Sequence, residues 1–300
     1  RTQSPIYVLP FILAMPSFVT AALSIATLLE SGLSLVKPAD ANDHVAGDPV
    51  LIKLNRDSVP VKRQGVVVSF RTTYWGVIEV GGPIAQEFRV VFDTGSGQVV
   101  VPASTCDSDA CLVHKRFNMS ASDTSVPINA DGYPVPDDEL CDEVDISFGT
   151  GQVTGQFVRD KVCVGTAPVE GDAASASHRQ LCLEMNVVMA VKMSTQPFQS
   201  FNFDGIMGLG LKNLAISDDF SFFDRVAESG KSQSAHFGVF LTEGEVEGEN
   251  SEIAIGGYNE KRLLHPLAWS HVAMADYGYW QVRVKAIRID GKELDVCKDG

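Results

Sequence analysis

The chain has 300 residues, enough for two ordinary domains, and its 45% hydrophobic content predicts a globular core rather than disorder. The formal net charge of −14 argues against nucleic acid as a partner, because binding to phosphate groups requires a basic surface. The chain begins without Met and ends shortly after a cysteine, so we expect it to be a piece of a longer chain.

An uncharged and mostly apolar run at residues 6–29 is long enough to span a bilayer. It is followed by Ala39-Asp40-Ala41, which has the small-x-small form of a signal-peptidase site. Two interpretations of residues 1–41 therefore stay open, a signal peptide and a signal anchor. Either one directs the chain into the secretory pathway, as a secreted protein, in a lysosome-like acidic compartment, or attached to a membrane through residues 6–29.

Residues 42–66 are mixed and polar and form the most clearly basic stretch of an acidic protein. From Val66 onward, short runs of Val, Ile, Phe and Thr alternate with Gly, Pro, Asp and Asn, which is typical of a mainly β domain built as a sandwich or barrel. A helix is expected only around residues 220–229. The expected first strands are residues 66–70, 74–80, 88–92 and 98–101.

The segment that carries chemistry is residues 90–97, Val-Val-Phe-Asp-Thr-Gly-Ser-Gly. Three apolar residues bring a strand up from the core, and Thr94 and Gly95 then turn the chain, so Asp93 is presented at the end of a buried strand. Gly95 allows the backbone to approach whatever Asp93 binds. Ser96 can hydrogen-bond the carboxylate and favour one protonation state. Taken alone, the motif also fits an ordinary Asp-Gly turn in a hairpin.

The residues around Asp93 resemble the pepsin family of eukaryotic aspartic endopeptidases, and the resemblance extends from about residue 74 to residue 300. Several segments carry it in the family's order: the first strand (74–81), the active-site motif (88–96) with Val101-Pro102, the first disulfide loop (106–118), the flap (145–151), the apolar-apolar-Gly segment (203–210), and the crossing into a second lobe (255–257 and 278–281). The resemblance implies a double-psi β-barrel lobe at residues 67–254, the start of a second lobe at residues 255–300, and a bilobal complete protein.

The implied activity is aspartic-type endopeptidase hydrolysis of protein or peptide substrates. In this chemistry two Asp carboxylates share a proton across one water, which the ionised carboxylate activates while the other protonates the peptide carbonyl. Asp93 supplies one carboxylate, with Thr94, Gly95 and Ser96 in support. A second Asp-Thr-Gly motif is absent from the 300 residues, so the chain alone is expected to be inactive. No metal or cofactor is implied, and the complete protein is expected to be a monomer.

Two other interpretations fit parts of the sequence. A single lobe that dimerises predicts a shorter chain, whereas residues 255–300 already resemble a second lobe. A non-catalytic relative that keeps the cleft would act as an inhibitor or a peptide-binding protein, and the residue at the missing second Asp position would decide between it and an enzyme.

The resemblance also assigns the flap and the apolar wall of the substrate cleft. The family usually has Tyr at the position of Phe148 and a hydrogen-bonding Trp at the position of Val100, so the loss of both partners puts the flap geometry and the rate in doubt more than the reaction type. The flap and substrate-binding residues are Phe148, Gly149, Thr150, Val91 and Ile206.

Covalent features are predicted at several positions. Cys106 and Cys111 lie in a Ser/Asp-rich stretch and suggest a small closed loop, whereas Cys163 and Cys182 flank an insert and suggest two joined strand ends. Six free thiols in a cytosolic protein are the alternative. Cys141 is expected to be free and Cys297 to pair beyond residue 300. Asn118-Met119-Ser120 is an N-glycosylation sequon.

Residues 42–66 also resemble the propeptide of a zymogen. Residues 50–56 are similar to the family's first propeptide strand, whose alternate apolar residues add to a sheet edge. Lys53, Lys62 or Arg63 would then neutralise the catalytic carboxylates, and the three are not distinguished by the sequence. Lys62-Arg63 is alternatively a site for a processing protease, and a solvated linker with incidental charges is the simpler interpretation.

Overall fold

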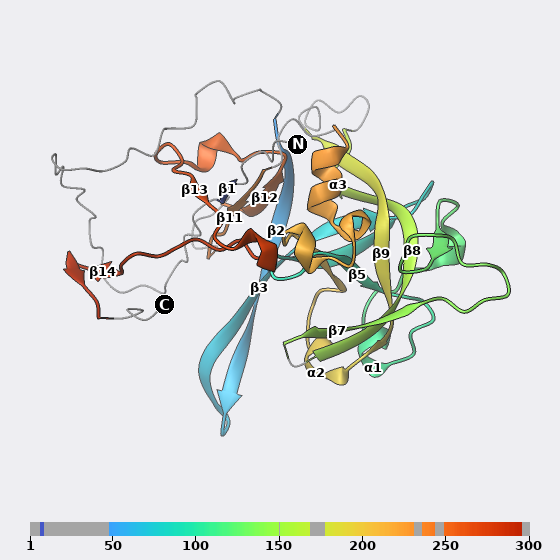
Figure 1. Cartoon of the computed structure of the whole chain (residues 1–300). Helices are drawn as coiled ribbons and strands as arrows, with labels where there is room; N and C mark the ends of the chain where they lie inside the picture. The colour runs from blue at the N-terminus through green and yellow to red at the C-terminus, as the bar shows by residue number, and fades with distance from the viewer. Residues whose placement is uncertain are drawn as a thin grey trace.

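The computed structural model describes residues 7–8, 48–149, 151–168, 178–230, 236–243 and 249–295. Strands are the commonest regular element among these residues (Figure 1). The large sheet contains β2 (Val50–Arg63), β3 (Val66–Val80), β4 (Gln86–Asp93), β5 (Val99–Pro102), β6 (Val126–Ile128), β7 (Glu143–Phe148), β8 (Gly151–Gly165), β9 (Gln180–Met193), β10 (Gly205–Gly208), β11 (Phe237–Phe240) and β12 (Ser251–Ile255).

The remaining elements are short. Two small antiparallel pairs lie outside the large sheet: β1 (Tyr7–Val8) with β13 (Ser270–His271), and β14 (Arg288–Ile289) with β15 (Lys292–Glu293). The α-helices are α1 (Asp109–Leu112), α2 (Thr195–Phe198) and α3 (Phe222–Glu228). The single-turn 3₁₀ helices are η1 (Met119–Ala121), η3 (Lys212–Leu214), η4 (Asp218–Phe220), η5 (Glu260–Arg262) and η6 (Ala275–Tyr277).

The large sheet closes on itself to form a barrel. Its 11 strands follow the order β11-β12-β2-β3-β4-β10-β5-β9-β8-β6, with β7 on β8, and an additional pairing joins β3 to β8. Strands β3, β4, β10, β5, β9 and β8 therefore form a ring. Two of its pairings are parallel, β10 with β4 and β5 with β9. The expected mainly β barrel is confirmed.

Two expectations about the elements need correction. Residues 66–70 and 74–80 were expected as separate strands, but they form one strand because residues 71–73 also pair with β2. A helix was expected only at residues 220–229, where α3 forms, yet α1 and α2 are also present. Each has four residues, which is too short for a 3.6-residue period to appear in the sequence.

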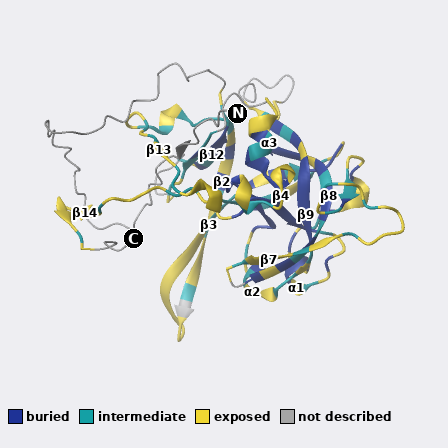
Figure 2. Ribbon diagram, in the orientation of Figure 1, coloured by how far each residue is buried: buried dark blue, intermediate teal, exposed yellow. Residues whose placement is uncertain are grey.

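Two apolar clusters fill the lobe. Because successive strand side chains point to opposite faces, Val99 and Val101 enter the larger cluster with Phe88 and Val90, whereas Val100 enters the second. Helix α3 covers the larger cluster with Phe222 and Val226, and Figure 2 shows the dark, buried strands beneath it. The second cluster contains Val100, Ala110, Ile128, Val153, Phe157, Val188, Ala190, Phe198 and Phe220.

Both predicted disulfides are formed, Cys106–Cys111 and Cys163–Cys182. The second joins residues directly opposite each other on β8 and β9, so it closes the base of the hairpin that carries the insert. Cys141 has a free thiol, and Cys297 lies outside the described residues.

Strands β2 and β3 form a long hairpin that projects from the barrel (Figure 1). Its turn is Gln64-Gly65, where both residues have positive φ, 50° and 81°, as a tight two-residue hairpin requires. At the base of the hairpin, residues 50–54 of β2 also pair with β12. At the tip the side chains are exposed, including Val66 at 65% and Phe70 at 63% (Figure 2).

Across the described ranges, no helix combines the length and the apolar character needed to cross a bilayer. Apart from residues 7–8, the apolar run at 6–29 lies outside those ranges.

A buried carboxylate connects three parts of the barrel. Asp204 is 3% exposed and precedes β10. Its carboxylate accepts hydrogen bonds from the backbone N–H of Arg89 at 3.0 Å, from the Arg89 guanidinium at 3.1 and 3.2 Å, and from the N–H of Lys115 at 3.0 Å. The His114 ring lies 3.7 Å away. Burial raises the pKa of Asp204, but these neighbours outweigh burial and hold that pKa well below its usual range.

We predict that Asp204→Asn lowers the free energy of unfolding at pH 7 by about 2–3 kcal/mol, because it leaves the Arg89 guanidinium without its charged partner. The folded-state pKa lies below the unfolded value of about 3.9, so the stabilisation is complete above about pH 4 and is lost as pH falls toward the folded value. Urea unfolding of both proteins between pH 3 and pH 7 measures this, and the exposed Asp123→Asn is the control. An equal loss of unfolding free energy in Asp204→Asn and Asp123→Asn would contradict the prediction.

Candidate active site

Asp93 is the last residue of β4, and the strand next to it fixes its position. In the parallel pairing of β10 with β4, Gly208 lies opposite Asp93, and the N–H of Leu209 donates to the Asp93 carbonyl at 2.7 Å. The backbone of Asp93 is thus part of the barrel. Its side chain is half-buried at the start of the turn that follows the strand.

Two local hydrogen bonds orient the Asp93 carboxylate. The N–H of Gly95 donates to Oδ1 at 2.9 Å, and the hydroxyl of Ser96 donates to Oδ2 at 2.8 Å. Ser96 is only 6% exposed, so its hydroxyl is held in a fixed environment. Because each carboxylate oxygen can accept more than one hydrogen bond, both retain capacity for a water or a substrate group. Thr94 lies in the same turn and is also half-buried.

The turn after Asp93 rests on the backbone of β10 with no space between them. A Cβ atom on Gly208 would lie 2.5 Å from the carbonyl carbon of Gly97, and one on Gly97 would lie 2.4 Å from the Ala215 nitrogen. The N–H of Gly208 donates to the Gln98 carbonyl at 3.0 Å, and that of Gly210 to the Ser96 carbonyl at 2.8 Å. Glycine at these positions allows the close contact that supports the Asp93 loop.

An apolar pocket lies between β5, β10 and the hairpin formed by β7 and β8. Phe148, at the end of β7, packs edge-on against Phe198 with ring centroids 6.3 Å apart, and Phe201 stacks on Phe203 at 4.6 Å. Asp93 is not among the residues that line the pocket, which include Val100, Phe148, Val153, Phe198, Phe201 and Ile206.

The predicted substrate-binding residues take different places in this arrangement. Ile206 lines the pocket together with Phe148. In the parallel pairing of β10 with β4, Ile206 lies opposite Val91, two register steps before the Gly208–Asp93 pair. Gly149 is exposed in the β7–β8 turn with φ 59°. Thr150 lies outside the described residues. Strand β10 therefore connects the pocket with Asp93.

The structure adds a residue that the sequence motifs did not single out. The indole N–H of Trp280 donates to the Leu209 carbonyl at 2.7 Å, and its ring packs edge-on against Phe223 and Phe237. Leu209 in turn donates to the Asp93 carbonyl. The resemblance of residues 278–281 to the family marked this segment, but it did not indicate that the indole supports the active-site loop.

Other predicted sites remain separate from this one. Asn118 is exposed and accepts a hydrogen bond from the N–H of Ser120, and its glycosylation stays a prediction. The turn at residues 123–125, which was not predicted as a site, is held by the Thr124 hydroxyl, which donates to buried Asp160. In the described part of the chain, no group of three or more His, Cys, Asp or Glu side chains is arranged to hold a metal ion.

Comparison with known proteins places these features in a family. A family model described as eukaryotic aspartyl protease matches residues 73–300. Cathepsin E of Aquarana catesbeiana is 32% identical over 227 residues, which cover 76% of this chain and 50% of that protein. Pepsin II-1 of Oryctolagus cuniculus is 31% identical over 229 residues, covering 75% and 50%. Phytepsin of Hordeum vulgare is 28% identical over 274 residues, covering 88% and 48%.

The chain thus spans about half the length of the curated relatives that it matches. The matched region includes Asp93 and its loop, the β7–β8 hairpin, β10 and the Trp280 segment. On this match and on its mostly β fold, the chain belongs to the eukaryotic aspartyl protease family, the pepsin-like aspartic peptidases.

Proposed function

We propose that this chain provides one half of the active site of an aspartic endopeptidase, with Asp93 as the catalytic carboxylate. The observation that carries the proposal is the fixed carboxylate at the end of β4, oriented by the Gly95 N–H and the Ser96 hydroxyl. Strand β10, which pairs with Asp93 through Gly208, also contributes Ile206 to the apolar pocket. This arrangement suits a carboxylate that must present the same oxygen atoms to a water in each catalytic cycle.

The second carboxylate would come from sequence outside these 300 residues. With both in place, the ionised carboxylate takes a proton from the water as its oxygen attacks the peptide carbonyl carbon, and the protonated one donates to the carbonyl oxygen. Loss of the C–N bond then releases a new carboxyl and a new amino terminus. In this scheme Ser96 and Gly95 are positioning residues, because their hydrogen bonds hold Asp93.

We further propose that the apolar side chains that line the pocket contact bulky apolar side chains of an extended peptide. Phe148 and Ile206 line it together, and the β7–β8 hairpin that carries Phe148 covers it. Gly149 and Thr150 would complete this flap. With Phe at position 148 and Val at position 100, the cover is apolar on both sides, and it discriminates by size and shape rather than by a hydrogen bond.

We propose that the chain enters the secretory pathway, since two disulfides persist best in oxidising compartments. Residues 42–66 would act as a propeptide-like segment, and the complete protein would be a monomer. Strand β2 supports the propeptide idea in one respect, because residues 50–54 occupy a sheet position beside β12. Ile52 and Leu54 lie in the larger apolar cluster, so release of the segment would require another strand to take that position.

The first prediction tests the reaction. A longer protein that contains both halves should cleave peptides between bulky apolar residues at about pH 4, where one carboxylate of a pair is readily protonated. Asp93→Asn should reduce kcat by about a thousandfold or more, because it removes the ionisable group. Cleavage is followed by mass spectrometry of the products. Asp123→Asn, at an exposed turn, should retain wild-type turnover.

Substantial turnover by Asp93→Asn would overturn the assignment of the catalytic residue. Correct folding without any turnover by the wild-type protein would favour a non-catalytic peptide-binding relative. The 300-residue chain alone should be inactive in the same assay.

The second prediction tests the pocket. In the longer protein, Phe148→Ala should lower kcat/KM for a substrate with a bulky apolar side chain by about tenfold to a hundredfold, because it removes one wall of the pocket. Phe148→Leu keeps an apolar side chain and should lower kcat/KM for the same substrate much less. Steady-state kinetics with paired substrates, one bulky and one carrying Ala at the same position, provides the measurement. Equal losses on both substrates would contradict the pocket assignment.

A further inference from the structure

The sequence contains three Lys-Arg dipeptides, at residues 62–63, 115–116 and 261–262. The three differ in how their backbone and arginine side chains are held in the fold. At the second, the Lys115 N–H donates to buried Asp204, and the Arg116 guanidinium donates to the carbonyls of Ser104 and Cys106. The next residue, Phe117, is 1% exposed. This backbone cannot be drawn out as an extended chain without breaking the contacts that fix the barrel.

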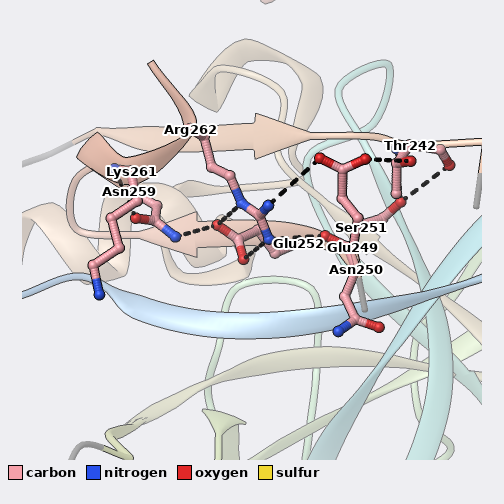
Figure 3. A network of polar contacts seen from close by, with 8 residues as sticks. All are labelled: Thr242, Glu249, Asn250, Ser251, Glu252, Asn259, Lys261 and Arg262. Carbon is pink, nitrogen blue, oxygen red and sulfur yellow. Dashed lines mark hydrogen bonds and ion pairs between the residues drawn. The ribbon is translucent and has the colours of Figure 1, made fainter. Parts of the chain in front are cut away.

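The third dipeptide is also fixed. Figure 3 shows the Arg262 guanidinium directed at the carboxylates of Glu252 and Glu249. It donates to both oxygens of Glu252, at 3.2 and 3.1 Å, and lies over the Phe240 ring at 4.3 Å. Asn259 caps the 3₁₀ turn by accepting from the Lys261 N–H at 3.1 Å. The Arg262 side chain and the local backbone are therefore both held by hydrogen bonds.

The first dipeptide has the opposite environment. Arg63 is exposed and ends β2, directly before the Gln64-Gly65 turn at the tip of the hairpin. Residues 55–63 pair only with β3 and residues 66–74 only with β2, so each strand has one unpaired edge there. An endopeptidase binds its substrate as an extended strand, and opening a two-stranded tip of this kind disturbs no part of the core.

We propose that the peptide bond between Arg63 and Gln64 is a processing site for an endopeptidase that selects paired basic residues, and that the cut leaves the two pieces associated. Water supplies the hydroxyl that completes the Arg63 carboxyl group and the proton that completes the Gln64 amine. The enzyme needed is one whose specificity pocket carries a carboxylate for the arginine. This inference does not depend on the proposed catalytic role of Asp93.

Retention of the cut strand follows from the base of the hairpin. Ile52 and Leu54 are 4% and 6% exposed within the larger apolar cluster, and residues 50–54 form a five-residue ladder with β12. On the other edge, Trp75 of β3 donates its indole N–H to Asp57 at 2.7 Å. None of these contacts involves the tip, so β2 should remain in the sheet as a noncovalent strand.

The experiment uses the full 300-residue chain carrying Asp93→Asn, which excludes self-cleavage, treated near neutral pH with a Lys-Arg-selective endopeptidase. We expect a new amino terminus at Gln64, formed at least about a hundredfold faster than cuts after Arg116 or Arg262. Arg63→Gln should remove this cut. Arg71→Gln, on the same hairpin but without a preceding basic residue, should leave its rate unchanged.

Hydrogen exchange of the cleaved protein tests retention separately. The amides of residues 50–54 should exchange as slowly after the cut as before it, because their ladder with β12 is intact. Primary cleavage after Arg116 or Arg262 would overturn the processing site. Fast exchange at residues 50–54 after cleavage would overturn retention of the strand.

Discussion

The hydrogen bonds between Asp204 and Arg89 set the register on which the rest of the barrel depends. The Asp204 N–H donates to the Arg89 carbonyl at 2.7 Å, and the Arg89 N–H donates back to the Asp204 carboxylate. This exchange comes immediately before the first parallel pair of β10 with β4, and four residues later it places Gly208 opposite Asp93. A slip of one residue would bring a side chain against Gly97, where the backbone leaves no space.

The same register makes the Asp93 loop part of the barrel rather than a surface appendage. Strand β10 pairs with β4 on one side and with β5 on the other, so it spans the two strands that the loop connects. The loop also accepts hydrogen bonds from the N–H of Gly208, at the end of β10, and from the N–H of Gly210 just after it. Movement of the Asp93 backbone therefore requires distortion of three strands, which helps to keep the reorganisation of the carboxylate small.

Local sequence patterns predicted the features that depend on neighbouring residues. Asp93 at a strand end, helix α3 and the two disulfides follow from apolar runs, turn residues and cysteine spacing. The continuity of β3 was missed because pairing in the hairpin, such as Ser58 with Thr72, overrides the polar interruption at residues 71–73. The Asp204 cluster was missed because its partner Arg89 lies 115 residues away, and no periodicity links such positions.

The Trp280 contact links the segment at residues 278–281 to the Asp93 loop through Leu209. Its indole bonds the Leu209 carbonyl, and the Leu209 N–H bonds the Asp93 carbonyl, so both sides of one peptide segment are held at once. A displacement of the segment that carries Trp280 would alter the hydrogen bonding of Leu209, one bond away from the Asp93 backbone. The position of the segment at residues 278–281 and the placement of the Asp93 backbone are therefore coupled, and a change that moves one would shift the other.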